Sequence, residues 1–162
     1  DILCPTKINV IQGSFDDLPR IVKKYGIRIL LLTGSKFLSS SNYLERLLHR
    51  FEIEEMEVFP FNGIKSNPTN YDVDEAVQLA KVNKCEVIVA IGGGSVIDSA
   101  KMVSIGCTSD LCCWDFFRDG DRPAREIVSK GLPLVVMPTT SGTGSEVTPF
   151  AVIKNEDKND DR

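Results

Sequence analysis

The feature that most constrains the fold is the stretch EVIVAIGGGSVIDSAK, residues 86–101. It opens with a continuous apolar run, Val87 to Ile91, which is typical of a strand buried on both faces of a parallel sheet. Three glycines at positions 92–94 follow, and from Ser95 onward the apolar residues recur at helical spacing. A buried strand that passes through consecutive glycines directly into a helix is typical of an α/β fold with a ligand site at the turn.

Strand and helix patterns alternate along the rest of the chain. Predicted strands occupy 7–11, 28–33, 56–61, 86–91 and 132–138, and predicted helices occupy 16–26, 41–51, 67–84 (after an initial turn) and 95–106. Gly26 is predicted to stop the first helix. A further strand is predicted to begin within 146–153, although Pro149 makes it unsuited to the centre of a sheet.

This alternation predicts one α/β domain, a Rossmann-like parallel sheet with helices on both faces and right-handed crossovers. The 162 residues are enough for a hydrophobic core. Residues 107–131 lack a clear period and are predicted to form a loop. The aromatic residues of this loop, which we expect to pack inward, are Trp114, Phe116 and Phe117.

Charge and composition exclude several classes of protein. The net charge of −4 leaves no basic surplus for a nucleic-acid backbone, and no apolar run approaches the roughly 20 residues that cross a bilayer. No signal-peptide pattern is seen. Five cysteines without a paired framework are typical of free, mostly buried thiols in a reducing compartment, so we expect a cytoplasmic protein. The single histidine, His49, is expected to be a surface residue.

The three glycines, Gly92, Gly93 and Gly94, predict a phosphate site at the turn. Glycine permits a positive φ and lets backbone N–H groups approach a ligand closely. The following helix points its positive dipole end at the same place, where Ser95 can add a hydroxyl, so a pyrophosphate is the expected occupant. The alternative is a helix that is capped by its own side chains and needs no ligand, because Ser95 and Asp98 have the spacing of a capping box.

A second polar loop, within MPTTSGTGSEVTPFAVI (137–153), follows the predicted strand 132–138. Because it leaves the same edge of a parallel sheet, it is expected to face the same crevice as the glycines. Its hydroxyl groups suit ribose and phosphate oxygens. The hydroxyl-bearing residues of the loop are Thr139, Thr140, Ser141, Thr143, Ser145 and Thr148. The alternative is a plain polar loop in which Thr143 and Glu146 form another capping box.

The end of the strand 28–33 bears on the choice of coenzyme. In dinucleotide folds an acidic residue near such a strand end holds the ribose 2′-hydroxyl. Here Gly34, Ser35 and Lys36 follow, so a hydroxyl and a cation can receive a 2′-phosphate. This favours NADP over NAD, with NAD as the alternative coenzyme. The alternative without a ligand is that Gly34 and Ser35 only form a turn.

GGGSVIDSAK and PTTSGTGSEVTPFAVI, in this order, resemble the amino-terminal domain of the iron-containing (group III) alcohol dehydrogenases. SNPT at 66–69 matches the same family, and the resemblance covers nearly the whole chain. It implies the amino-terminal domain of the dehydroquinate synthase-like superfamily. A dehydroquinate synthase or glycerol dehydrogenase type of relative ranks lower, since the synthase type also carries the glycine triplet but does not usually carry the TTSGTGSE run.

The resemblance implies a set of coenzyme contacts. Gly93, Gly94 and Ser95 hold the pyrophosphate, Thr139, Thr140 and Thr143 contact the nucleotide, Asn67 lies beside the adenosine half, and Asp98, Thr148 and Val152 lie toward nicotinamide. NAD-preferring members have an acidic residue at the position of Gly34, so its absence agrees with the preference for NADP.

The resemblance also implies chemistry that this chain does not carry. Family members bind Fe²⁺ or Zn²⁺ through one Asp and three His residues of a helical carboxy-terminal domain, and the sequence stops before any of them. We therefore expect residues 1–162 to be the coenzyme domain of a longer enzyme that acts on a small alcohol or aldehyde, inactive alone, with no catalytic residue and no metal ligand. A homodimer formed through the strand near 7–11 is a further expectation from the family. A non-catalytic NADP(H)-binding module is the alternative function.

Overall fold

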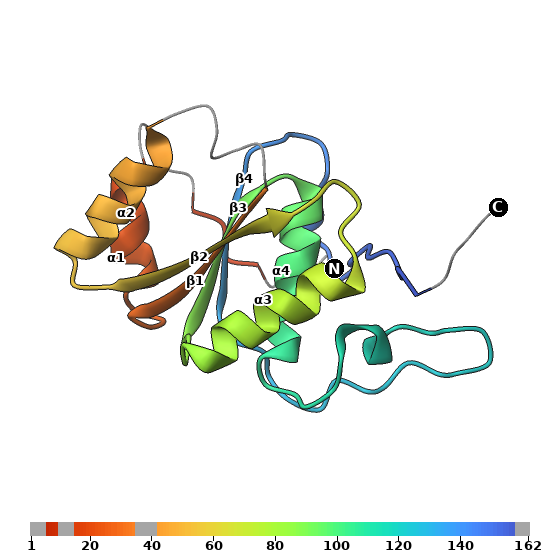
Figure 1. The fold of residues 1–162 in the computed structure, drawn as a ribbon. Helices are drawn as coiled ribbons and strands as arrows, with labels where there is room; N and C mark the ends of the chain where they lie inside the picture. The colour runs from red at the N-terminus through yellow and green to blue at the C-terminus, as the bar shows by residue number, and fades with distance from the viewer. Residues whose placement is uncertain (1–5, 10–14, 35–41, 158–162) are drawn as a thin grey trace.

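A parallel sheet forms the centre of the structure (Figure 1), a computed structural model that describes residues 6–9, 15–34 and 42–157. Within these residues the strands are β1 (Arg28–Gly34), β2 (Glu57–Ile64), β3 (Val87–Gly92) and β4 (Leu134–Pro138). Their order across the sheet is β2-β1-β3-β4. All neighbouring pairs are parallel, which confirms the predicted fold class.

The two inner strands are buried on both faces. β3 is buried at every residue, and its register pairs Leu31 of β1 with Val89. Leu31 and Val89 belong to one hydrophobic cluster, whereas their neighbours Leu30 and Ile88 belong to the cluster on the other face. The continuous apolar runs in the sequence follow from this arrangement, since both faces of a parallel sheet are covered by helices.

Two layers of helix enclose the sheet. The helices are α1 (Leu18–Val22), α2 (Tyr43–Ile53), α3 (Asn70–Val82) and α4 (Gly94–Gly106), and the short 3₁₀ turns are η1 (Phe15–Asp17), η2 (Cys113–Phe116) and η3 (Ser145–Val147). Figure 1 shows α1 and α2 on one side of the sheet and α3 and α4 on the other. Phe51 of α2 and Val103 of α4 are fully buried in the two opposite clusters.

Two predicted strands are wrong within the described part of the chain. Residues 7–9 are exposed and have no regular secondary structure, and the remainder of the predicted strand 7–11 lies outside the described residues. No described strand borders 7–9, and a strand needs a partner to pair with. Residues 146–153 form the end of η3 and then an irregular segment, because Pro149 cannot donate to a ladder.

The first predicted helix is shorter than 16–26. α1 ends at Val22, and Tyr25 N–H donates to the Val22 carbonyl at 2.8 Å in a turn. Gly26 is therefore not a helix stop. A Cβ at Gly26 would lie 2.5 Å from Cβ of Glu86, whose carboxylate accepts the Ile27 N–H at 2.7 Å. Gly26 allows the chain to pass close to Glu86 as it enters β1.

The segment 107–131 packs its aromatic residues as predicted. The rings of Trp114 and Phe117 stack with their centroids 4.9 Å apart, and Phe117 and Phe116 pack against the cluster below α3 and α4. Asp74 of α3 accepts the backbone N–H of Cys113 at 2.8 Å and fixes η2; burial raises the pKa of this carboxyl. Residues 121–130 are exposed and form part of the loop that projects from the domain in Figure 1.

The described cysteines are free thiols. Burial raises the pKa of Cys85 to about 11 and those of Cys107 and Cys113 to about 12. These three thiols therefore stay protonated and unreactive near neutral pH, while Cys112 is exposed. His49 is an exposed residue of α2 beside Glu52, as expected. Across the described residues, no helix has the length and apolar character needed to cross a membrane.

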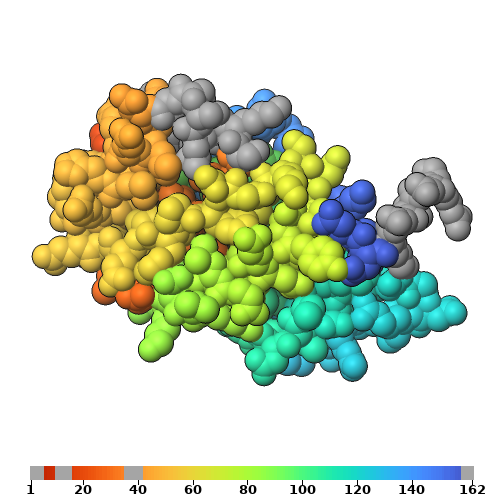
Figure 2. All heavy atoms as spheres, viewed as in Figure 1, coloured from red at the N-terminus to blue at the C-terminus, as the bar shows by residue number. Residues whose placement is uncertain are grey.

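A capping box begins α3. The Thr69 hydroxyl accepts the Asp72 N–H at 3.3 Å, and the Asp72 carboxylate accepts the Thr69 N–H at 2.9 Å. The segment around Lys154 lies against this helix start (Figure 2), with the Asn70 N–H donating to the Lys154 carbonyl at 3.0 Å. This cap was not predicted from the sequence, although Thr69 and Asp72 have the T-x-x-D spacing of a capping box.

Replacing Thr69 by alanine is expected to lower the free energy of unfolding by about 1 kcal/mol, since a buried helix start loses its capping oxygen. Urea denaturation followed by circular dichroism measures this change. Thr108→Ala is the control, because its hydroxyl donates only to a carbonyl of the preceding turn. Equal stability of the two variants would contradict the assigned role of the capping box.

Candidate functional site

The turn between β3 and α4 lies at the carboxyl edge of the sheet, as predicted. β3 ends at Gly92, and α4 begins at Gly94 with Gly93 as an extended N-cap residue. Within the described chain no side-chain hydrogen bond caps this N-terminus, in contrast to the boxed start of α3. The N–H groups of Val96 and Ile97 donate to the Gly93 carbonyl at 3.1 Å. Gly94 and Ser95 are therefore the residues whose N–H groups, with the positive dipole end, can meet another acceptor.

Gly92 is required by packing rather than by backbone conformation. Its φ is not left-handed, nor are those of the two glycines that follow, so this turn does not use the positive φ that glycine permits. A Cβ at Gly92 would lie 2.5 Å from Cγ2 and 2.7 Å from Cβ of Val96. The Gly92 carbonyl also accepts the Thr139 N–H at 2.9 Å, which joins the turn to the loop after β4.

The other two glycines face that same loop. A Cβ at Gly93 would lie 3.0 Å from the hydroxyl oxygen of Thr140, and one at Gly94 would lie 3.4 Å from Cβ of Thr143. Both threonines are exposed. The two loops therefore lie together at one edge of the sheet, as predicted, and place hydroxyl groups beside the uncapped helix end.

The strand order creates a switch point at this edge. β1 and β3 are neighbours, but β1 leads through α2 to β2 on one side and β3 leads through α4 to β4 on the other. Ligands of open α/β sheets bind at such a point. Gly34 ends β1 there, and a Cβ on it would lie 3.6 Å from Cγ2 of Val96. Ser35 and Lys36 lie outside the described residues.

Asp98 belongs to a polar network instead of a capping box. Ser95 lies inside α4, since Gly93 is the N-cap residue, so the predicted box of Ser95 and Asp98 does not form. The Asp98 carboxylate accepts hydrogen bonds from the Ser145 hydroxyl, from the Lys101 ammonium at 3.1 Å and from the Val152 N–H at 3.1 Å. Ser145 was expected among the hydroxyl groups of its loop, but its bond to Asp98 was not predicted. Lys101 was missed by sequence reasoning, although the D-x-x-K spacing places Asp98 and Lys101 on one helix face.

The remaining predicted residues lie on surface turns. Asn67 is exposed, with a φ of +59°, between β2 and α3. Thr148 is exposed directly after η3, and Val152 is 77% exposed. The predicted box of Thr143 and Glu146 does not form, because a glycine is the N-cap residue of η3. One carboxylate oxygen of Glu146 is buried without a hydrogen-bond partner in the described structure.

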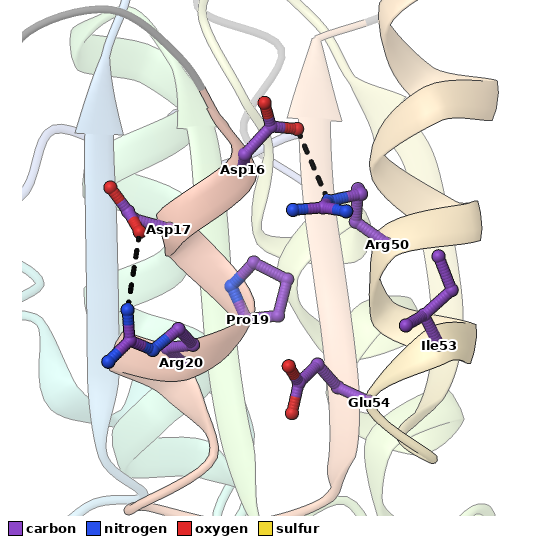
Figure 3. Close-up of a pocket in the computed structure, with 7 residues that line it drawn as sticks. All are labelled: Asp16, Asp17, Pro19, Arg20, Arg50, Ile53 and Glu54. Atoms are coloured by element: carbon purple, nitrogen blue, oxygen red, sulfur yellow. Dashed lines mark ion pairs between the residues drawn. The ribbon is translucent and has the colours of Figure 1, made fainter.

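A separate shallow pocket lies between α1 and α2 (Figure 3). Seven residues line it: Asp16, Asp17, Pro19, Arg20, Arg50, Ile53 and Glu54. Two ion pairs, Asp16–Arg50 at 3.2 Å and Asp17–Arg20 at 3.8 Å, occupy its walls. The pocket lies on the helical layer opposite α4, and none of the predicted site residues lines it.

The described residues fit a dinucleotide better than a metal ion. A pyrophosphate suits the uncapped start of α4 and the glycine turn, where the backbone can approach a ligand closely. The exposed hydroxyl groups suit the oxygens of a ribose. No group of three or more His, Cys, Asp or Glu side chains that could hold a metal occurs in the described ranges. The iron or zinc implied by the family resemblance therefore has no fitting site among them.

Comparison with known proteins identifies the family. The family model described as iron-containing alcohol dehydrogenase matches residues 5–162. NADH-dependent butanol dehydrogenase B of Clostridium acetobutylicum is 31% identical over 96% of this chain and 39% of its own length. Choline dehydrogenase of Bacillus subtilis is 32% identical over 95% of this chain and 38% of its own length.

Solved structures agree with this result. NADH-dependent butanol dehydrogenase A from Thermotoga maritima has a TM-score of 0.86 and 33% identity, with 97% of this chain and 38% of that chain covered. Sulfoacetaldehyde reductase from Bifidobacterium kashiwanohense, in complex with NAD⁺, has a TM-score of 0.83 and 30% identity, with 97% of this chain and 40% of that chain covered. The chain thus spans about two-fifths of the length of these relatives. Because the family model extends over almost every residue and the fold agrees, the chain belongs to the iron-containing alcohol dehydrogenase family.

Proposed function

We propose that this chain is the coenzyme-binding part of a metal-dependent, NADP(H)-preferring alcohol dehydrogenase or aldehyde reductase. The observation that carries the proposal is the start of α4, which lacks a side-chain cap among the described residues and is faced by a hydroxyl-rich loop. The names of the relatives, butanol dehydrogenase and sulfoacetaldehyde reductase, support a small alcohol or aldehyde as the substrate. The free thiols support a cytoplasmic location.

The residues of the two loops would bind and orient the coenzyme. In the proposed arrangement Gly93, Gly94 and Ser95 contact the pyrophosphate, Thr139, Thr140 and Thr143 contact the nucleotide, Asn67 lies beside adenosine, and Asp98, Thr148 and Val152 lie toward nicotinamide. A bound nicotinamide would supply the hydride acceptor or donor. No proton-transfer step is assigned to the described residues, and no step through a metal, since they do not hold a fitting ligand set.

The preference for NADP(H) rests on the end of β1. Gly34 has no carboxylate to repel a 2′-phosphate, and Ser35 and Lys36 follow it in the sequence. Several relatives are named as NADH-dependent enzymes, so the choice of coenzyme is a sharp test. The test is calorimetric titration of the purified 162-residue chain with NADPH and, separately, with NADH. Tighter binding of NADPH supports the full proposal, tighter binding of NADH overturns the preference alone, and absence of both contradicts the coenzyme site.

Replacing Gly34 by aspartate is expected to lower NADPH affinity about tenfold and to raise NADH affinity, because a carboxylate repels the 2′-phosphate and accepts from a 2′-hydroxyl. The structure accommodates the change, since the nearest atoms to an added Cβ are 3.6 and 3.9 Å away. Competition binding with both coenzymes measures the ratio. Gly34→Asn is the matched control without charge, and an equal shift in both variants would show that charge is not the cause.

A further inference from the structure

The ammonium group of Lys101 is nearly buried and makes three hydrogen bonds within the protein. It donates to the Asp98 carboxylate at 3.1 Å, to the Ser145 hydroxyl at 2.9 Å and to the Phe150 carbonyl. The side chains of Lys101 and Asp98 are only 16% and 14% exposed. Since a lysine ammonium has three donors, this network uses all of them.

The network joins α4 to the segment after η3, which reaches the hydrophobic core only at its far end, through Ala151 and Ile153. Phe150 and Val152 are 76% and 77% exposed, so apolar burial contributes little to the position of the part before Ala151. Asp98 binds both ends, through the Ser145 hydroxyl and the Val152 N–H. Between η3 and Phe150 the segment is therefore held against α4 mainly by polar contacts, while Ala151 and Ile153 anchor its end in the core.

The strand order determines which side of the coenzyme site this segment occupies. β1, with Gly34 at its end, borders β3 on one side, and β4, which leads into the loop with Ser145, borders β3 on the other. A dinucleotide whose pyrophosphate lies at the turn after β3 and whose adenosine ribose lies near Gly34 extends its other half over the β4 loop. Lys101 and Asp98 lie beneath that loop.

We propose that Lys101 and Asp98 are positioning residues that pre-order the segment from Ser145 to Val152 for the half of the coenzyme beyond the pyrophosphate. This inference rests on the proposed coenzyme function. Lys101 acts through the loop, because its donors are taken up by Asp98, Ser145 and Phe150. Loss of the network costs binding energy because the loop must then be ordered at the moment of binding.

The test compares a whole dinucleotide with its adenosine half in the 162-residue chain. Lys101→Met is expected to weaken NADPH binding about tenfold while changing the affinity for adenosine 2′-phosphate 5′-diphosphate less than about twofold. NADH and ADP form the parallel pair. Asp98→Asn is expected to give the same selective loss. Lys81→Met is the matched control, since Lys81 on α3 donates to the Ser109 carbonyl away from both loops.

The outcomes separate this inference from the function on which it rests. If the unaltered chain binds neither dinucleotide, the coenzyme function fails. If it binds the dinucleotide no better than the adenosine half, or if Lys101→Met weakens both ligands equally or neither, the positioning role is overturned while the coenzyme site stands. A thermal unfolding scan of each variant identifies general destabilisation, which would lower both affinities together.

Discussion

Replacing Gly94 by valine is expected to reduce the affinity of the chain for NADPH by about a hundredfold, which corresponds to losing the charge-assisted hydrogen bonds of the pyrophosphate. Gly94 is the first residue of α4, at the uncapped helix end. A branched side chain there would occupy the space in front of the N–H groups, between the helix and Thr143. Isothermal titration calorimetry with NADPH measures the loss.

Gly94→Ala separates a ligand role from a structural role at the same position. A Cβ at Gly94 makes only ordinary contact with Thr143, at 3.4 Å, and alanine is a better helix residue than glycine by up to about 1 kcal/mol. The melting temperature is therefore expected to stay level or rise while NADPH affinity falls. If valine and alanine both leave binding unchanged, the glycine turn is only a turn and the coenzyme assignment fails.

Replacing Gly92 by alanine, unlike Gly94→Ala, is expected to lower stability. The free energy of unfolding should fall by about 2 kcal/mol because the added Cβ overpacks the core. The added Cβ would lie 2.5 Å from Cγ2 and 2.7 Å from Cβ of Val96. Val96 is buried in the first turn of α4, and a β-branched side chain cannot rotate away easily. Urea denaturation measures the change.

Gly34→Ala is the matched control for this effect. Gly34 ends the neighbouring strand β1, and a Cβ on it would lie 3.6 Å from the same Val96 methyl, an ordinary contact. Its cost is expected to be well below that of Gly92→Ala. Adding Val96→Ala to Gly92→Ala should recover part of the lost stability. A Gly92→Ala variant as stable as the control would show that the strand end shifts without cost.

Several parts of the fold could be predicted because they depend on local pattern. The buried runs of β1 and β3 and the amphipathic period of α2 and α4 follow from which residues are apolar and at what spacing, so these elements were predicted within a few residues. The end of α1 at Val22 and the irregular course of 146–153 were not predicted. After α1 the chain passes close to Glu86, a neighbour distant in the sequence, at Gly26, whereas the segment 146–153 forms no ladder because Pro149 cannot donate to one.

The two loops of the candidate site could be predicted from the sequence, but the hydrogen-bond partners of their residues could not. Glycine and threonine content indicated two loops at one sheet edge. The partner of each residue was not readable, because the capping boxes expected for Ser95 with Asp98 and for Thr143 with Glu146 depend on where each helix begins. Only the folded chain shows which residue is the N-cap.

The sequence by itself determined the parallel α/β architecture, the glycine turn after β3 and the family of the chain, since these depend on apolar period and on contiguous motifs. The tertiary structure alone decided which glycine serves packing and which faces the loop, and that Lys101 and Asp98 hold Ser145 and Val152. The reason is physical: the contacts of Gly93 with Thr140 and of Asp98 with Ser145 and Val152 join residues far apart in the chain, and no local pattern encodes their distances.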